Sequence, residues 1–378
     1  MSDPVRLSAA DALEATTCRP RVLVGFDGFL DSITSAVGTR RSMQAEDFEP
    51  MRTIDALASR IAGAGGGRSV NIELRERELR AGGNGPLLAS ALSAQGASVT
   101  LIGALGESDA EPIHPAYSPL VERCERAISI APSARTDALE FDDGKVMFNW
   151  SANLDPVDWA HVVGHVGLGP LAEMCAQADV IATINWTNLG GLPSIWRGLR
   201  AEVFPGLGTP PGVFVDLSDP AKRTDGSVYE MLDDLRSLAE VCPITLGLNL
   251  AEAQRLGGLI LGEAVPLRRD TGSMRDAAVR LREELSLHTV LVHTRGMVAG
   301  SERDGSAAVQ TRQIARPAIS TGAGDHFNGG YIAARVCGLG LAESLACGAD
   351  TASAYVGTGI APDRRGLVAT LRSDLGLD

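Results

Sequence analysis

The chain has 378 residues, which is enough to bury a large core in one α/β domain with an appendage or in two ordinary domains. Its formal net charge of −13 argues against a nucleic-acid partner, because phosphate backbones are bound by clustered lysine and arginine. No apolar run approaches the ~20 residues of a membrane span, and the residues before Val22 lack the pattern of a signal peptide. We therefore expect a cytoplasmic protein that contacts neither nucleic acid nor a membrane.

Six cysteines are scattered along the chain, without a C-x-x-C pair or a histidine at zinc-ligand spacing. This usage favours reduced thiols over a disulfide framework or a zinc site. Because the composition is acidic, an anionic nucleotide would have to be held by local backbone amides and metal ions.

The N-terminal part of the chain predicts short elements joined by glycine-rich turns. A helix is expected over 7–15 with Ser8 as its N-cap, followed by a buried strand over 21–26. Residues 63–68 lack the ending of a Walker-type phosphate loop, so a flexible or tightly turning connection is expected there. The charged run 73–80 is typical of a solvated strand or helix face, and a helix over 87–95 and a strand over 99–103 follow it.

Candidate ligand-binding residues follow the first strand. Asp27 and Asp31 come just after it, and ligands of open α/β sheets bind beyond the carboxyl ends of the strands. Gly82 and Gly83 precede the next helix and let a ligand approach the backbone closely. Asn84 adds an amide that both donates hydrogen bonds to hydroxyl groups and accepts them.

Residues 136–149 interrupt this pattern with a predicted β-hairpin, whose turn lies at 142–145. Such a hairpin is expected to cover the ligand-binding edge as a lid, to form a dimer contact, or to be a surface decoration.

The rest of the chain alternates strands and helices, as a doubly wound parallel sheet requires. Strands are predicted at 180–185, 213–217, 244–248, 289–293, 297–301 and 307–314, and helices at 192–203, 229–239, 251–256, 273–286, 326–337, 341–355 and 367–375. The fold class is therefore α/β, with a doubly wound, mainly parallel sheet flanked by helices in a single domain over 1–378. A small β appendage is expected from parts of about 30–80 and 134–150.

The most informative stretch is 319–330, ISTGAGDHFNGG, where small residues precede an acid and then an apolar helical pattern. Gly322, Ala323 and Gly324 let backbone N–H groups face a ligand, and the following helix adds the positive end of its dipole. This arrangement suits an anion. Asp325 lies at the edge of the anion site, in the position of a base that deprotonates an alcohol as it attacks a phosphate.

Two further motifs have structural alternatives. Asn249 and Glu252 open a helix after an apolar strand and are suited to hold water around Mg²⁺, but their spacing is also that of a helix capping box. Residues 294–296, Thr-Arg-Gly, either contact nucleotide phosphates or form an ordinary turn between two strands.

Polar residues follow two more strands at the predicted ligand-binding edge. Asn185 ends one of them, and the adjacent Trp186 either stacks on a sugar or nucleoside ring or packs beneath the lid. Residues 216–223, DLSDPAKR, end another strand and either contact phosphate or form a capped turn.

Taken in order, these features resemble the ribokinase-like, or PfkB, family of carbohydrate kinases. The shared features are the first strand ending in Asp27, the Gly-Gly-Asn turn, the inserted hairpin, Asn-x-x-Glu, Thr-Arg-Gly and the Gly-Ala-Gly-Asp loop. The resemblance covers about 22–364. Its most specific part, 321–330, is similar to the second signature of the family, and the Gly-Gly pair at 82–83 is less similar to the first signature.

The resemblance implies an ATP-dependent, Mg²⁺-assisted kinase that phosphorylates a hydroxyl group of a sugar or a sugar-like molecule. It implies that Asp325 is the general base, that the amides of 322–324 form an anion hole, and that Asn249 and Glu252 organise Mg²⁺ and its waters. The hairpin would be the β-lid. Residues expected to hold the acceptor are Asp31, Gly83, Asn84, Asn185 and, as a second candidate acid, Asp27. Residues expected near the nucleotide are Thr294, Arg295, Gly296, Asn328 and Gly359, the last in a purine-binding segment over 348–359.

Two positions depart from the family pattern. Members often begin the second signature with Asp-Thr, where this chain has Ile319-Ser320, and that aspartate is linked to a monovalent cation. Potassium activation is therefore not predicted. The first signature commonly has an asparagine several residues after Gly-Gly, whereas Asn84 follows at once. Acceptor recognition is thus expected to differ from that of simple ribose or fructose kinases.

Other functions stay open at this point. A nucleoside kinase of the same fold would act on a ribosyl 5′-hydroxyl group, and a sugar- or nucleotide-binding protein would keep the fold without turnover. A nicotinamide-dependent oxidoreductase is disfavoured because no G-x-G-x-x-G follows the first strand. A homodimer through the lid is one expected assembly.

Overall fold

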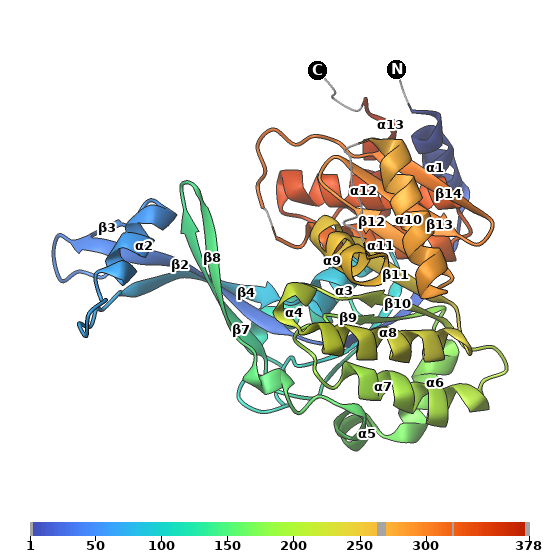
Figure 1. Ribbon diagram of the computed structural model, residues 1–378, viewed down its shortest axis with the longest axis horizontal. Helices are drawn as coiled ribbons and strands as arrows, with labels where there is room; N and C mark the ends of the chain where they lie inside the picture. Colours follow the sequence, from blue (N-terminus) through green and yellow to red (C-terminus); the bar gives the residue numbers. More distant parts are fainter. Residues whose placement is uncertain (1–2, 263–269, 320, 375–378) are drawn as a thin grey trace.

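The computed structural model describes residues 3–262, 270–319 and 321–374 (Figure 1). Ser320 and Leu375, which belong to predicted features, lie outside the described residues. The main sheet has nine strands in the order β14-β13-β12-β11-β10-β9-β1-β5-β6 among these residues. In this order, neighbouring strands between β12 and β6 pair in parallel. Strand β13 pairs antiparallel with both β12 and β14. Their bounds are β1 Arg21–Phe26, β5 Ser98–Gly103, β6 Arg126–Ser129, β9 Val180–Ile184, β10 Gly212–Asp216, β11 Ile244–Asn249, β12 Thr289–His293, β13 Met297–Glu302 and β14 Gly305–Gln310.

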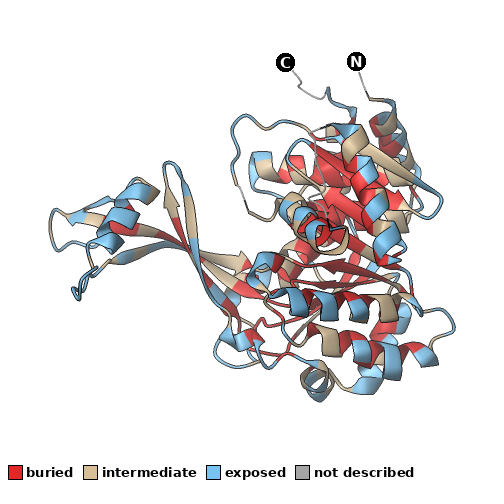
Figure 2. Ribbon diagram, in the orientation of Figure 1, coloured by how far each residue is buried: buried red, intermediate tan, exposed pale blue. Residues whose placement is uncertain are grey.

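Helices cover both faces of this sheet, because its central strands are apolar on both sides. In β1, Leu23 packs into one core while Val22 and Val24 pack into the other. The first core is covered by α5 Trp159–Val166, α6 Leu168–Gln177, α7 Leu192–Gly198, α8 Asp225–Ala239, α9 Leu250–Ile260 and α10 Thr271–Leu285. The second is covered by α1 Pro4–Ala15, α3 Asn84–Ala94, α4 Ser118–Val121, α11 Ala323–Val336, α12 Leu341–Thr358 and α13 Arg364–Arg372. Figure 2 shows the buried strands between helices whose outer faces are exposed.

A second sheet projects from the body of the molecule (Figure 1). Its order is β3-β2-β7-β8, with β4 also paired to β2. It consists of β2 Phe29–Arg40, β3 Phe48–Pro50, β4 Leu74–Gly82, β7 Ala134–Phe141 and β8 Gly144–Trp150, and α2 Ile54–Ala62 packs on it. The hairpin of β7 and β8 agrees with the sequence prediction. The long strand β2 was not predicted, because its apolar and polar residues do not alternate with a period of two.

Most of the predicted helices begin earlier than their sequence pattern indicates, among them α1, α3 and α11. Asp3 rather than Ser8 caps α1, because its carboxylate accepts a hydrogen bond from Val5 N at 3.0 Å and Pro4 takes the first helical position. The helix predicted from 87 begins at Asn84, and the helix predicted from 326 begins at Ala323. Asp325 therefore lies inside the first turn of α11 rather than before it.

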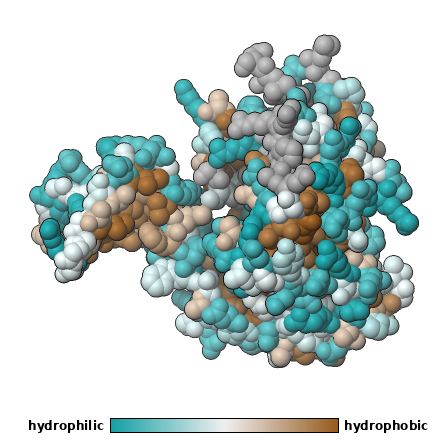
Figure 3. All heavy atoms as spheres, in the orientation of Figure 1, coloured by the Kyte–Doolittle hydropathy of each residue, from teal (hydrophilic) through white to brown (hydrophobic). Residues whose placement is uncertain are grey.

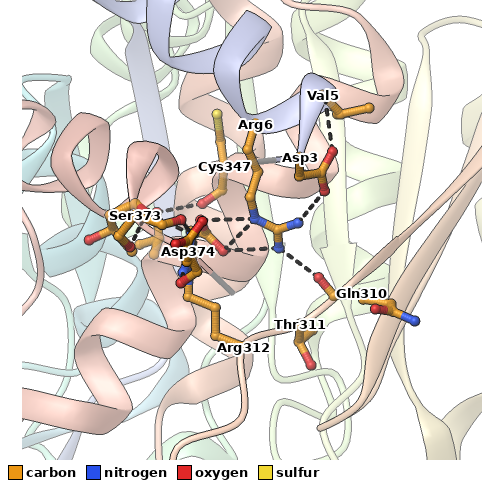
Figure 4. A network of polar contacts seen from close by, with 12 residues as sticks. Asp3, Val5, Arg6, Gln310, Thr311, Arg312, Cys347, Ser373 and Asp374 are labelled. Atoms are coloured by element: carbon orange, nitrogen blue, oxygen red, sulfur yellow. Dashed lines mark hydrogen bonds and ion pairs between the residues drawn. The ribbon is translucent and has the colours of Figure 1, made fainter. Parts of the chain in front are cut away.

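A buried ion-pair network joins the two ends of the chain (Figure 4). Arg6 of α1 donates to both carboxylate oxygens of Asp350 at 3.1–3.2 Å, and to the carbonyl oxygen of Gln310 at 2.6 Å. Arg312 approaches the same Asp350 carboxylate at 3.1 Å. The network fixes α1 and the segment after β14 against α12. In the described part of the chain, no helix has both the length and the apolar character needed to span a membrane.

Candidate active site

The carboxyl ends of three neighbouring strands and the amino ends of two helices meet in one place. Asp27 follows β1 and Asn185 follows β9, while Asp216 is the last residue of β10. From the other side, Asn84 is the first residue of α3 and Asp325 lies in the first turn of α11. Hydrogen bonds link all five side chains or their main-chain neighbours into one site, as described below.

Asp27 joins the first strand to α3. Its fully buried carboxylate accepts hydrogen bonds from Asn84 N at 2.9 Å, Gly85 N at 2.7 Å and Asn185 Nδ2 at 2.7 Å. Burial raises the pKa of Asp27 to about 6, although these three hydrogen bonds act in the opposite direction. The carboxylate therefore organises Asn84 and Asn185 from beneath the site.

Asp31 lies in a different sheet from the first strand, which it follows closely in the sequence. It belongs to β2 of the second sheet, where it pairs with Arg80 of β4 and Thr136 of β7. A Cβ atom on Gly82 would lie only 2.4 Å from Asp31 Cγ, so only glycine leaves room for this carboxylate. Burial raises the pKa of Asp31. Gly82 thus places Asp31 beside the residues that precede Asn84.

Asp325 is 5% exposed, and its Oδ1 accepts a hydrogen bond from Asn84 Nδ2 at 2.9 Å. Burial is the main reason that its pKa lies well above the usual value, and the negative charge of Asp216 raises it further. The hydrogen bond from Asn84 lowers it. A buried carboxylate with raised proton affinity is suited to take a proton from a bound hydroxyl group.

The loop before α11 leaves the start of that helix open to an anion. Gly322 is the N-cap with φ 82°, and no side chain caps the first turn. A Cβ atom at Gly322 would lie 3.1 Å from Leu87 Cδ1 and 3.2 Å from the Tyr355 hydroxyl. The first-turn N–H groups have no helical acceptor, so Ala323 and Gly324 offer their amides to a negatively charged group.

Asn328, which was predicted to lie near the nucleotide, is a buried residue of α11. It is 1% exposed, and its Nδ2 donates to Asp216 Oδ2 at 2.9 Å. Its side chain therefore links α11 to the end of β10 beneath the site.

Asn249 and Glu252 form the capping box that their spacing allows. Asn249 Oδ1 accepts from Glu252 N at 3.0 Å, and Glu252 Oε2 accepts from Asn249 N at 2.8 Å. Glu252 is 2% exposed, and its pKa is well above the usual value because of burial and the nearby charge of Asp216. The capping role is thus present whether or not the pair also holds metal-bound water.

Buried acids dominate the charge of the site. Among the described residues, Asp27, Asp216, Glu252 and Asp325 form no ion pair with lysine or arginine. No group of three or more His, Cys, Asp or Glu in the described ranges is close enough to hold a metal ion directly. The uncompensated negative charge suits a divalent cation that keeps most of its own water.

The Thr-Arg-Gly motif forms the turn between β12 and β13. Thr294 Oγ1 donates to Met297 O at 2.9 Å and accepts from Gly296 N at 3.2 Å. Arg295 and Gly296 are exposed beyond this turn. The hairpin alternative is therefore realised. Gly359 caps the end of α12 with φ 75° and is also exposed.

Trp186 is 2% exposed and packs in the first core, with the guanidinium of Arg223 5.2 Å from the ring centroid. The ring has no free face for a sugar or a nucleoside in this arrangement.

Sequence reasoning left one connection of the site unassigned. Ser218, in the segment after β10, donates from Oγ to Asn84 Oδ1 at 3.0 Å. Its φ of 63° and the φ of 63° at Asn185 are unusual for residues other than glycine. The sequence signal for this connection was the polar segment 216–223 after a strand. No local pattern indicates that this segment bonds to Asn84.

The chain is similar to known proteins both in sequence and in fold. A family model described as prokaryotic ketohexokinase matches residues 5–373. A ketohexokinase from Haloferax volcanii is 30% identical over 344 residues, which are 90% of this chain and 88% of that protein. The solved structure of Arabidopsis thaliana ribokinase complexed with ribose and ATP has a TM-score of 0.61 at 17% identity and covers 95% of this chain and 100% of that chain. A probable sugar kinase from Rhizobium etli CFN 42 has a TM-score of 0.62 at 16% identity, with 94% and 98% covered. At these identities the two structures establish the fold alone, and the predicted ribokinase-like α/β class is confirmed.

Proposed function

This chain belongs to the prokaryotic ketohexokinase family and is a carbohydrate kinase, and on that premise we propose that it transfers the γ-phosphoryl group of ATP to a hydroxyl group of a ketohexose. The observation that carries this proposal is the pairing of a buried carboxylate, Asp325, with the uncapped first turn of α11. The carboxylate can accept a proton, and the uncapped turn can hold an anion. Phosphoryl transfer to an alcohol needs both. The name of the Haloferax relative supports a ketohexose as the acceptor.

In the proposed reaction, Asp325 takes the proton from the acceptor hydroxyl group. The hydroxyl oxygen bonds to the γ-phosphorus as the bond from that phosphorus to the oxygen of ADP breaks. The amides of Gly322, Ala323 and Gly324 face the transferring group and reduce the cost of its negative charge. Most of the rate acceleration would come from holding the reactants in line.

Mg²⁺ fits the site because the buried acids lack cationic partners in the described chain. Asn249 and Glu252 would hold the ion through water, since their oxygen atoms already take part in the capping box. A bound Mg²⁺ supplies positive charge next to the phosphates. We propose no requirement for a monovalent cation, because Ile319 offers no carboxylate at the position that the family links to one.

Acceptor binding is proposed for Asp31, Gly83 and Asn84, with Asp27 and Asn185 supporting Asn84 from below. The hydrogen bonds from Asn84 N and Asn185 Nδ2 to Asp27 support this division of roles. The exposed turn 294–296 and the exposed Gly359 remain proposed contacts of the nucleotide. The buried Asn328 would act on that site only through its neighbours.

Asp325→Asn tests the proposal directly. The amide cannot accept the proton, so kcat is expected to fall by at least about 10²-fold while the protein stays folded. The measurement is ADP formation with ATP, Mg²⁺ and a panel of ketohexoses, aldoses and nucleosides, followed by locating the phosphate on the product. Turnover close to that of the wild-type protein would contradict the role of Asp325, and preference for a nucleoside would contradict the proposed acceptor.

We further propose that two copies associate through the second sheet. Large apolar side chains are exposed there on β8, where Met147 is 52%, Phe148 47% and Trp150 65% exposed. Figure 3 shows hydrophobic residues gathered on the projecting sheet. Burying this surface against a second copy would remove apolar area from water.

A further inference from the structure

The segment that follows β10 reaches the proposed base through one side chain. Ser218 Oγ donates to Asn84 Oδ1 at 3.0 Å, and Asn84 Nδ2 donates to Asp325 Oδ1 at 2.9 Å. The amide of Asn84 therefore stands between a hydroxyl donor and a carboxylate acceptor. Each end of the amide has a partner that matches it.

The orientation of this amide matters because its two ends are opposite in hydrogen-bonding character. With Nδ2 toward Asp325, the amide donates to the carboxylate. If the amide were turned over, Oδ1 would face the carboxylate and two acceptors would repel each other. The Asp325 carboxylate only accepts and so selects the first orientation, and the Ser218 hydroxyl group holds the amide in it by donating to the oxygen end.

Ser218 is itself held by its neighbours. Its main-chain N–H donates to Asp216 Oδ1 at 2.9 Å, and Asp216 Oδ2 accepts from Asn328 Nδ2 at 2.9 Å. Asn328 and Asp325 both belong to α11, so the contacts close a ring from α11 through β10 and α3 back to α11. The left-handed φ of 63° at Ser218 is an unfavourable conformation that this ring stabilises.

We propose that Ser218 is a positioning residue for phosphoryl transfer, which sets the amide of Asn84 so that the amide orients the carboxylate of Asp325. Ser218 acts through Asn84 and does not touch the reacting atoms. Asp216 and Asn328 hold the segment that carries Ser218. This inference rests on the proposed role of Asp325 and adds a residue that the motifs of the sequence do not reveal.

Ser218→Ala and Ser218→Gly together test the role of the hydroxyl group. Loss of one hydrogen bond that orients the base is expected to lower kcat about tenfold in both variants, with the KM for ATP unchanged. Glycine tolerates the left-handed φ, so a loss caused by backbone strain alone would spare Ser218→Gly. Ser93→Ala, which removes a hydroxyl bonded to Ser90 O within α3, is the matched control and should keep wild-type kcat.

A double-mutant cycle with Asn84→Ala separates positioning from a general structural effect. If Ser218 acts through Asn84, Ser218→Ala should lower kcat in the wild-type background and leave it unchanged in the Asn84→Ala background. Wild-type kcat in both Ser218 variants would overturn the inference, and so would an equal loss in both backgrounds. An inactive Asp325→Asn protein together with a fully active Ser218→Ala protein would reject the inference and leave the proposed function standing. An active Asp325→Asn protein would reject the proposed function itself.

Discussion

At the scale of single residues, two buried aspartates have different surroundings. Asp27 accepts three N–H donors, two of them from the main chain of α3. Asp325 accepts one side-chain donor, from Asn84, and lies near the charges of Asp216 and Asp27. The first carboxylate thus accepts more hydrogen bonds that favour its charged form than the second does. Their environments therefore support the proposal that Asp27 organises the site and that Asp325 is the base.

The pH dependence of kcat/KM should reflect the raised pKa of Asp325. Only the carboxylate form accepts a proton, so kcat/KM should increase with pH through a midpoint above the ordinary value of 3.8. Asn84→Ala removes the hydrogen bond that lowers this pKa, so its midpoint should lie at higher pH than that of the wild-type protein. Rate profiles of both proteins at subsaturating sugar provide the measurement. A midpoint that stays in place or moves to lower pH would contradict this assignment.

At the scale of elements, the start of α11 combines two requirements. The helix must begin at Ala323 to place Asp325 in its first turn, and Gly322 must turn the chain with a positive φ to let it begin there. Tyr355 of α12 and Leu87 of α3 close in on Gly322 from two sides. The proposed anion-binding loop is thus shaped by the packing of three helices.

Gly322→Ala should therefore lower both stability and activity. The left-handed φ costs an L-residue about 1–2 kcal/mol, and the added Cβ presses on Leu87 and Tyr355, so the loop must shift. We expect a lower thermal midpoint and a kcat reduced about tenfold or more. Gly338→Ala is a matched control, since its φ is 84° and a Cβ there meets no atom within 4 Å. It should lose stability and keep kcat. Equal kcat in the two variants would contradict a role for the shape of the loop.

At the scale of the whole molecule, the two sheets meet at the site. Strand β2 begins at Phe29, two residues after Asp27, and β4 ends at Gly82, two residues before Asn84. The second sheet is therefore connected to the main sheet through the residues proposed to hold the acceptor. Contact between two copies along the second sheet would act on the site through these same short connections.

The proposed association can be disrupted by placing charge on the exposed strand. Met147→Glu combined with Phe148→Glu should convert a dimer to a monomer, because burying two carboxylates against an apolar surface is unfavourable. Sedimentation velocity measures the mass directly. Val241→Glu changes an exposed apolar residue outside the second sheet and should leave the mass unchanged. A monomeric wild-type protein, or a dimer that survives the double substitution, would contradict the proposal.

Local sequence patterns predicted much of the main fold. The apolar runs of β1 and β12 and the turn of the β7–β8 hairpin depend on neighbouring residues, so their positions agree closely with the structure. The carbohydrate-kinase assignment came from the order of several short motifs along the chain, and the family match confirms it. The first residues of α1, α3 and α11 were less predictable. Their N-caps, Asp3, Gly83 and Gly322, lie before the apolar pattern of each helix begins.

The sequence by itself determined the fold class, the family and the place of the glycine loop with Asp325, because each depends on local periodicity or on a contiguous motif. Only the tertiary structure decided which side chains meet at that loop. Asn84 and Asp325 are 241 residues apart and Ser218 and Asn84 are 134 apart, so no pattern along the chain predicts either hydrogen bond. The same holds for Asp31, which pairing between strands places in the second sheet. The environment of the proposed base is a property of packing between distant segments.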